Sequence, residues 1–165
     1  MKNIDYKKLE QKLAAKIRNR IMNRTLDGYD YLGQKFDPYT KQYADKKGVG
    51  VDDVNLVLSG SMMRNFYVDV KITDEPEEFF GDYLWFPGVE ITYSFNHIED
   101  GKGTTPLKKY LWNAQGFDGF YGRKDRAGLF KRHTPSRDFL GLDNDATLFD
   151  EVEINDMLNE ILETM

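Results

Sequence analysis

The N-terminal segment has the hydrophobic spacing of an amphipathic helix. Lysine and arginine occupy most of its polar positions, and its apolar side chains recur every three or four residues, at Tyr6, Leu9, Leu13, Ile17 and Ile21. Asn3 is the predicted N-cap. The same spacing returns between about 145 and 163, where aspartate and glutamate surround the apolar face. We therefore predict a basic and an acidic amphipathic helix, which frame the sheet between them and attract one another across it.

Two central segments alternate apolar and polar residues, which is typical of half-buried strands. Residues 67–73 are apolar at even positions, and residues 89–95 are apolar at odd positions. A third segment, 82–86, leads into Pro87-Gly88, a turn pair expected to join it to 89–95, although Pro-Gly matches a tight hairpin poorly. Together these segments predict an antiparallel β-sheet.

A short helix is predicted before the first strand. Residues 54–58 fit either a short strand or the lead-in to a helix. Ser59 or Ser61 can cap a helix that runs through Met62, Met63 and Phe66. We expect these three side chains to face the sheet.

Two long regions, 25–53 and 96–137, are rich in glycine and show no clear periodicity. Loops of this length in a compact domain are usually functional or disordered. The aromatic residues of 96–137 argue against disorder, and we expect this region to order against a partner such as another subunit. The predicted fold class is α+β, a single domain over 1–165 in which an antiparallel sheet is flanked by a long N-terminal and a C-terminal amphipathic helix.

Composition limits the chemistry of the chain. Its 165 residues fit one ordinary domain, and the absence of cysteine excludes disulfides, thiolate metal sites and a cysteine nucleophile. The first residues lack the apolar core of a signal peptide, and no run approaches the roughly 20 apolar residues that span a bilayer. We expect no membrane contact and a cytoplasmic location during synthesis.

Charge is segregated along the sequence. Residues 1–24 carry a net +6, 25–100 carry −9, 101–137 carry +7 and 138–165 carry −9. Blocks of alternating sign can satisfy one another within one fold or between copies of it, and the first of these is the simpler interpretation.

Nucleotide-binding, metalloprotease and serine-hydrolase motifs are absent from the sequence. His97 with Glu99 and Asp100 could act as a general base or hard-metal site, but a polar loop is the simpler interpretation. The segment 143–145 resembles the start of a calcium-binding loop but lacks its later glycine and glutamate. We assign no catalytic residue, metal or cofactor.

One basic region has a composition suited to nucleic acid. Its aromatic residues alternate with candidate phosphate contacts, namely Lys108, Lys109, Arg123, Lys124, Arg126, Lys131 and Arg132. The sequence pI of about 5.1 and the two acidic blocks oppose binding by the chain as a whole. Sequence-independent DNA contact is most plausible where a ring of subunits surrounds a duplex.

Three stretches, in this order, carry a resemblance to a known family. The first runs from 24 to 46, the second from 56 to 62 and the third from 134 to 142. Their motif residues are Phe36, Pro38, Tyr39, Tyr43 and Lys46, then Ser59, Gly60 and Met62, and finally Pro135, Arg137, Phe139, Leu140 and Gly141. In order and spacing these stretches resemble the phage virion morphogenesis family, the Mu-G-like and tail-completion proteins of tailed phages.

The resemblance implies a structural virion protein without a catalytic site. Its subunit would be a small α+β domain that forms a ring, expected to be a hexamer, and completes the tail or joins it to the DNA-filled head. Its partners would be copies of itself, connector or head-completion proteins, tail-tube proteins and DNA in the central channel. The sequence departs from the family pattern at 96–101 and in 74–88, which resembles an insertion. A DNA-binding accessory protein and an enzyme that uses His97 are the alternative hypotheses.

Overall fold

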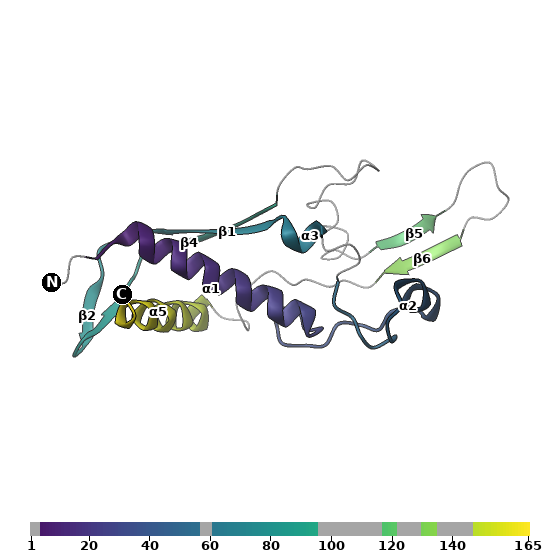
Figure 1. The fold of residues 1–165 in the computed structure, drawn as a ribbon, viewed down its shortest axis with the longest axis horizontal. Helices are drawn as coiled ribbons and strands as arrows, with labels where there is room; N and C mark the ends of the chain where they lie inside the picture. Colours follow the sequence, from purple (N-terminus) through teal and green to yellow (C-terminus); the bar gives the residue numbers. More distant parts are fainter. Residues whose placement is uncertain (1–3, 57–60, 96–116, 122–129, 135–146) are drawn as a thin grey trace.

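The computed structural model describes residues 4–56, 61–95, 117–121, 130–134 and 147–165 (Figure 1). Its helices are α1 (Tyr6–Leu26), α2 (Lys41–Lys47), α3 (Ser61–Arg64) and α5 (Thr147–Glu163). Its strands are β1 (Phe66–Ile72), β2 (Glu77–Phe80), β3 (Tyr83–Trp85), β4 (Val89–Phe95), β5 (Phe117–Tyr121) and β6 (Phe130–Thr134). The fold class is α+β, with a long N-terminal and a C-terminal helix, as predicted.

The long helix α1 forms because one face of it is continuously apolar. Side chains at Leu9, Leu13, Ile17 and Ile21 are fully buried, which confirms the predicted face. The predicted N-cap, Asn3, is wrong. The helix begins at Tyr6, and the Asp5 carboxylate accepts a hydrogen bond from the Lys8 amide at 3.1 Å.

Strands β1 and β4 pair antiparallel, as the two alternating segments predict. The register places Val68 opposite Tyr93 and Val70 opposite Ile91, so the apolar side chains of both strands share one face. Helix α1 packs against β1 and covers that face. The opposite face is polar and exposed, with Lys71 directly opposite Glu90.

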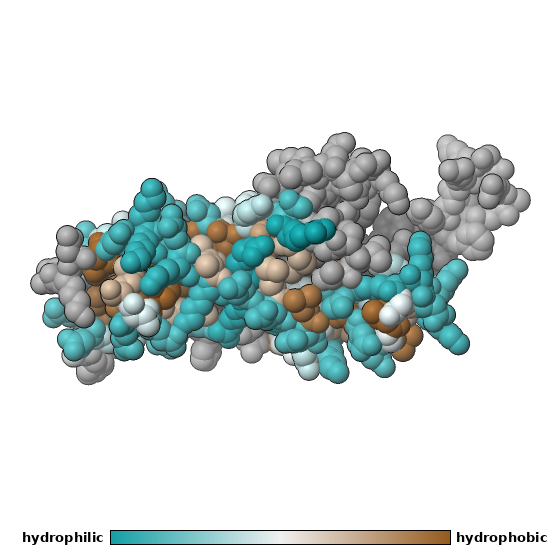
Figure 2. Space-filling model, viewed as in Figure 1, coloured by the Kyte–Doolittle hydropathy of each residue, from teal (hydrophilic) through white to brown (hydrophobic). Residues whose placement is uncertain are grey.

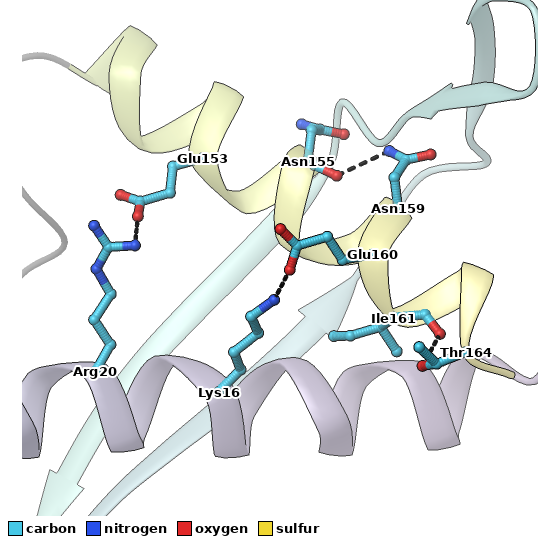
Figure 3. A network of polar contacts seen from close by, with 8 residues as sticks. All are labelled: Lys16, Arg20, Glu153, Asn155, Asn159, Glu160, Ile161 and Thr164. Carbon is cyan, nitrogen blue, oxygen red and sulfur yellow. Dashed lines mark hydrogen bonds and ion pairs between the residues drawn. The ribbon is translucent and has the colours of Figure 1, made fainter.

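The basic helix and the acidic helix attract one another directly. Helix α5 lies beside α1 (Figure 1), and two ion pairs join them, Lys16 with Glu160 and Arg20 with Glu153 (Figure 3). The predicted attraction is therefore confirmed, but its predicted path across the sheet is wrong. Helix α5 instead contacts α1 and β3.

Strand β3 pairs with β2 rather than with β4. The predicted hairpin through Pro87-Gly88 is therefore wrong, and the partner of β3 is β2, which begins at Glu77. Strands β2 and β3 are joined by a tight turn at Gly81, where φ is +60°. This turn forms a local hairpin, whereas Pro-Gly fits a tight hairpin poorly. Among the described residues the strands form three two-stranded antiparallel sheets: β1 with β4, β2 with β3, and β5 with β6.

Two asparagines of α5 bind the edge of β3 that faces away from β2. The Phe86 amide donates to Asn155 Oδ1 at 2.5 Å, and Asn155 Nδ2 lies 3.5 Å from the Phe86 carbonyl oxygen. One turn later, Asn159 accepts from the Leu84 amide at 2.9 Å and donates to the Leu84 carbonyl at 2.7 Å. These amides replace a neighbouring strand, so the backbone polar groups of the edge are satisfied.

Two tyrosine hydroxyls bind carboxylates on neighbouring elements. Tyr83 donates to Asp156 at 3.0 Å and Tyr6 donates to Glu75 at 2.8 Å. Burial raises the pKa of each tyrosine above 10, and the hydrogen bond and charge of the carboxylate raise it further. Because the folded pKa is the higher one, this stabilisation is present below pH 10 and is lost as the pH rises through the raised value.

Regular structure also occurs inside both regions that lack periodicity. Helix α2 lies within 25–53, and β5 and β6 lie within 96–137. The short α3 confirms the predicted helix, and Met62 and Met63 are buried in the core. The predicted extent is wrong, because α3 ends at Arg64 and the buried Phe66 is instead the first residue of β1. Residues 54–56 form neither a strand nor a helix.

The asparagine contacts lead to a test of stability. Replacing Asn155 by Ala leaves the buried Phe86 amide and carbonyl without their partner, so N155A should lower the free energy of unfolding by about 1–3 kcal/mol. Urea denaturation measures the change. The control is V152A, because the Val152 side chain on the same helix is 43% exposed and should change stability by less than about 0.5 kcal/mol. Equal effects of the two variants would contradict this role of Asn155.

Candidate interaction surfaces

The first family-like stretch includes a tight turn directly after α1. Gly28 has a φ of +89°, and a Cβ there would lie 2.8 Å from the Val54 carbonyl oxygen. The turn is closed by the Asp30 carboxylate, which accepts from the amides of Leu32 at 2.9 Å and Gln34 at 2.8 Å. The chain then returns toward α1, where the Phe36 amide donates to the Gly28 carbonyl at 2.8 Å.

Tyr39 is the centre of this stretch. Its ring is buried, and its hydroxyl accepts hydrogen bonds from Lys47 Nζ at 2.8 Å and from the Leu56 amide at 3.2 Å. The Lys47 ammonium also donates to Asn55 Oδ1 at 2.5 Å and lies 4.6 Å from the centre of the Tyr39 ring. These contacts join α2 to residues 55–56.

Helix α2 holds Lys47 in the position that these contacts need. The Thr40 hydroxyl caps the helix at the Tyr43 amide, and Gly48 ends it with a left-handed φ of +74°. The Tyr43 ring packs edge-on against Tyr39 at 4.9 Å between centroids. Leu56, which Tyr39 binds, has a φ of +50°, a conformation that costs free energy for a leucine and needs such contacts to hold it.

The structure brings together part of the predicted site. Phe36 and Tyr39 are buried, Tyr43 is half-buried, and Pro38 and Lys46 are exposed. Lys46 points to solvent, and the neighbouring Lys47, which the sequence analysis missed, makes the contacts to Tyr39. The motif residue Met62 is buried in α3. In this part of the chain Phe36, Tyr39 and Met62 therefore belong to the buried core.

Few of the other site residues predicted from the sequence lie in the described part of the chain. Two basic candidates, Lys131 and Arg132, lie in β6, opposite Phe120 and Gly119 of β5. The remaining candidates lie outside the described residues: Ser59, Gly60, Lys108, Lys109, Arg123, Lys124, Arg126, Pro135, Arg137, Phe139, Leu140 and Gly141, as well as His97, Glu99 and Asp100.

A groove of about 430 Å³ runs between α1 and β1. Glu10 and Arg18 from α1 line it, together with Ala14, Ala15 and residues 67–70 of β1. The Glu10 carboxylate accepts from the Ile72 amide at 2.9 Å. Arg18 Nε donates to the Phe66 carbonyl at 2.9 Å, and its Nη2 donates to the Met63 carbonyl at 3.3 Å. Both charged side chains therefore bind backbone groups of the sheet and of α3.

Two patches of opposite charge lie at the end of the molecule where α1 begins. A basic patch on α1 comprises Lys7, Lys8 and Lys12. An acidic patch comprises Glu77, Glu78 and Asp82 of the β2–β3 hairpin and Asp74, which precedes it. The Tyr6–Glu75 hydrogen bond brings the two elements together. Neither patch forms an ion pair within the described part of the chain. Hydrophilic residues cover much of the face drawn in Figure 2.

Within the described residues, no three His, Asp or Glu side chains are grouped as a metal site would require. None of the described helices is long and apolar enough to cross a membrane. Comparisons with protein-family models, with curated proteins and with solved structures give no match. The resemblance to the virion morphogenesis family therefore stays a prediction.

The contacts of Tyr39 can be tested by removing its hydroxyl. Y39F deprives Lys47 and the Leu56 amide of their shared acceptor, so it should destabilise the region around α2 by about 1–3 kcal/mol. Hydrogen exchange of the Leu56 amide reports this change as faster exchange. Y31F is the control, since the Tyr31 hydroxyl has no hydrogen bond to another described residue. Unchanged exchange at Leu56 in Y39F would contradict this role.

Proposed function

We propose that this chain is a structural virion protein of a tailed bacteriophage, a neck or tail-completion subunit that acts as a ring of identical copies, expected to be a hexamer. The observation that carries the proposal is the set of three family-like stretches in the family's order. The subunit would be synthesised in the host cytoplasm and would remain in the virion. Its neighbours would be connector or head-completion proteins and tail-tube proteins, with DNA in the channel.

The charges of the described residues support assembly between copies. The ion pairs between α1 and α5 use Lys16, Arg20, Glu153 and Glu160, yet the basic and acidic patches remain without ion pairs in the described chain. When two different surfaces of one chain are complementary, head-to-tail contacts can repeat and close into a ring. Complementary charge also orients the subunits and accelerates their encounter.

The roles of the motif residues support a structural rather than a catalytic use of the first stretch. Phe36 and Tyr39 are buried, and the hydroxyl of Tyr39 accepts hydrogen bonds from Lys47 and from the Leu56 amide. Such contacts hold the stretch in one conformation, and a surface held in one conformation loses less conformational entropy when it meets a neighbour.

Deletion of the gene from the phage or prophage that carries it tests this function. Electron microscopy should show DNA-filled heads separate from tails if the subunit joins them, or tails of abnormal length if it ends the tail. A complemented strain should produce normal particles. Normal infectious particles from the deletion strain would contradict the proposal. Salt-dependent DNA binding by the isolated chain, together with normal particles, would favour the accessory DNA-binding protein instead.

The same complementation system tests the basic patch. A copy that carries K7E and K8E should restore fewer joined particles than the wild-type gene, because both substitutions oppose contact with an acidic neighbour. K35E is the matched control, since Lys35 is an exposed lysine outside the patch. Equal restoration by the two variants would exclude the patch from assembly.

A further inference from the structure

The edge of β1 that faces away from β4 can be identified from its hydrogen bonds. The Thr73 amide, directly after β1, donates toward β4 at the Gly88 carbonyl, 2.7 Å away. The Ile72 amide instead donates to a side chain of α1. Because the backbone groups of a strand alternate in direction, the odd residues of β1 face β4 and the even residues face away from it. The outer edge therefore presents the amides and carbonyls of Val68 and Val70.

This edge is open in its middle. Glu10 and Arg18 of α1 bind backbone groups at its two ends. Between them, the outward amides and carbonyls of Val68 and Val70 make no hydrogen bond within the described part of the chain. Unpaired backbone groups at a sheet edge are a template for another strand. The two capped ends limit such a strand to the few residues that lie between them.

The groove beside this edge favours small side chains in the added strand. It has a volume of about 430 Å³, and Ala14 and Ala15 of α1 line it together with Val68 and Val70. Residues directly opposite each other in a strand pair direct their side chains to the same face of the sheet. The residues opposite the two valines would therefore meet the helix at its alanines. Glycine, alanine or serine fits such a position better than a large side chain.

Charge favours a basic residue between the two small ones. Asp69 lies between the valines on the exposed face of the sheet, and it is the charged residue that β1 contributes to the groove. Its neighbour on β4 is the uncharged Thr92, and Asp69 forms no ion pair with a described residue. Oppositely charged residues directly across from each other stabilise strand pairing. A lysine or arginine opposite Asp69 would therefore find a partner there.

The short length of the open edge favours the antiparallel direction. In an antiparallel ladder, two residues that face each other can exchange both of their backbone hydrogen bonds. An antiparallel segment opposite Val68, Asp69 and Val70 would therefore satisfy the amides and the carbonyls of both valines. Parallel pairing uses slanted bonds and is slightly less stable per residue.

We propose that the outer edge of β1 binds an extended segment of another protein as an added antiparallel strand, and that this segment carries a lysine or arginine between two small residues. The backbone hydrogen bonds would supply affinity, while Asp69 and the alanines of α1 would supply specificity. This docking site is additional to the proposed assembly of the chain and does not depend on it.

A synthetic peptide tests the site on the full-length chain. Fluorescein-labelled Ser-Ala-Lys-Ala-Ser-amide should bind in a fluorescence polarisation titration, and the unlabelled peptide should slow hydrogen exchange at the Val68 and Val70 amides. Methylation of the backbone nitrogens of both alanines removes the donors that face β1, so it should weaken binding by about tenfold or more. Methylation of the lysine backbone nitrogen is the matched control. That amide faces away from β1, and binding should be unchanged.

A substitution in the chain tests the charge. D69K should weaken binding of the lysine peptide by about fivefold, and it should favour the peptide in which glutamate replaces the lysine. D52K is the control, because Asp52 is exposed but lies outside the strands. It should bind both peptides as the unmodified chain does.

Any one of three results would overturn the proposal. Equal weakening by the two kinds of methylation would show that the alanine amides do not pair with β1. Equal binding by D69K and D52K would exclude Asp69 from the site. Failure of the unmodified peptide to bind or to protect the Val68 and Val70 amides, with the chain folded by circular dichroism, would exclude the site itself.

Discussion

Burial of the apolar face of α1 is the interaction on which the described structure depends. Leu9, Leu13, Ile17 and Ile21 are fully buried, and the other elements pack around them. One side of the helix covers β1, and another side contacts α5. Removal of such large side chains from water is the main favourable contribution to folding. Ion pairs such as Lys16–Glu160, with both side chains partly exposed, add orientation more than stability.

Side chains that bind backbone groups make the small sheets possible. A two-stranded sheet is marginal in water by itself, and its edges expose unpaired amides and carbonyls. Asn155 and Asn159 from α5 satisfy the edge at residues 84–86, and Glu10 and Arg18 from α1 satisfy the ends of the β1 edge. The helices therefore limit where another strand can pair, and the middle of β1 is the place they leave open among the described residues.

The regular elements could be predicted from the sequence because their periodicities are strong. The alternation of 67–73 and 89–95 predicts both the strands and the shared apolar face, and the spacing in α1 predicts its buried residues. The pairing of β3 could not be predicted in this way. Pro87-Gly88 marks a turn, but it does not say which strand lies beside 83–85, and Asn155 and Asn159 on α5, far along the chain, help to decide it.

The candidate site was harder to predict because its contacts are formed by tertiary structure. Phe36, Tyr39 and Tyr43 do come together, but Lys47 binds Tyr39 where the motif pointed to Lys46. Adjacent residues on a helix point about 100° apart, so only the position of α2 decides which lysine reaches the ring. The role of Asn155 and Asn159 could have been predicted from their spacing. They are four residues apart in an otherwise apolar and acidic helix, so their side-chain amides lie on one face.

The proposed function requires that the chain assembles with copies of itself. Native mass spectrometry of the purified full-length chain tests it most directly. At low salt, where charge contacts are least screened, the spectrum should show one closed assembly, expected to contain six copies of the 19.3 kDa chain. A mass of 19.3 kDa at every protein concentration would contradict the claim.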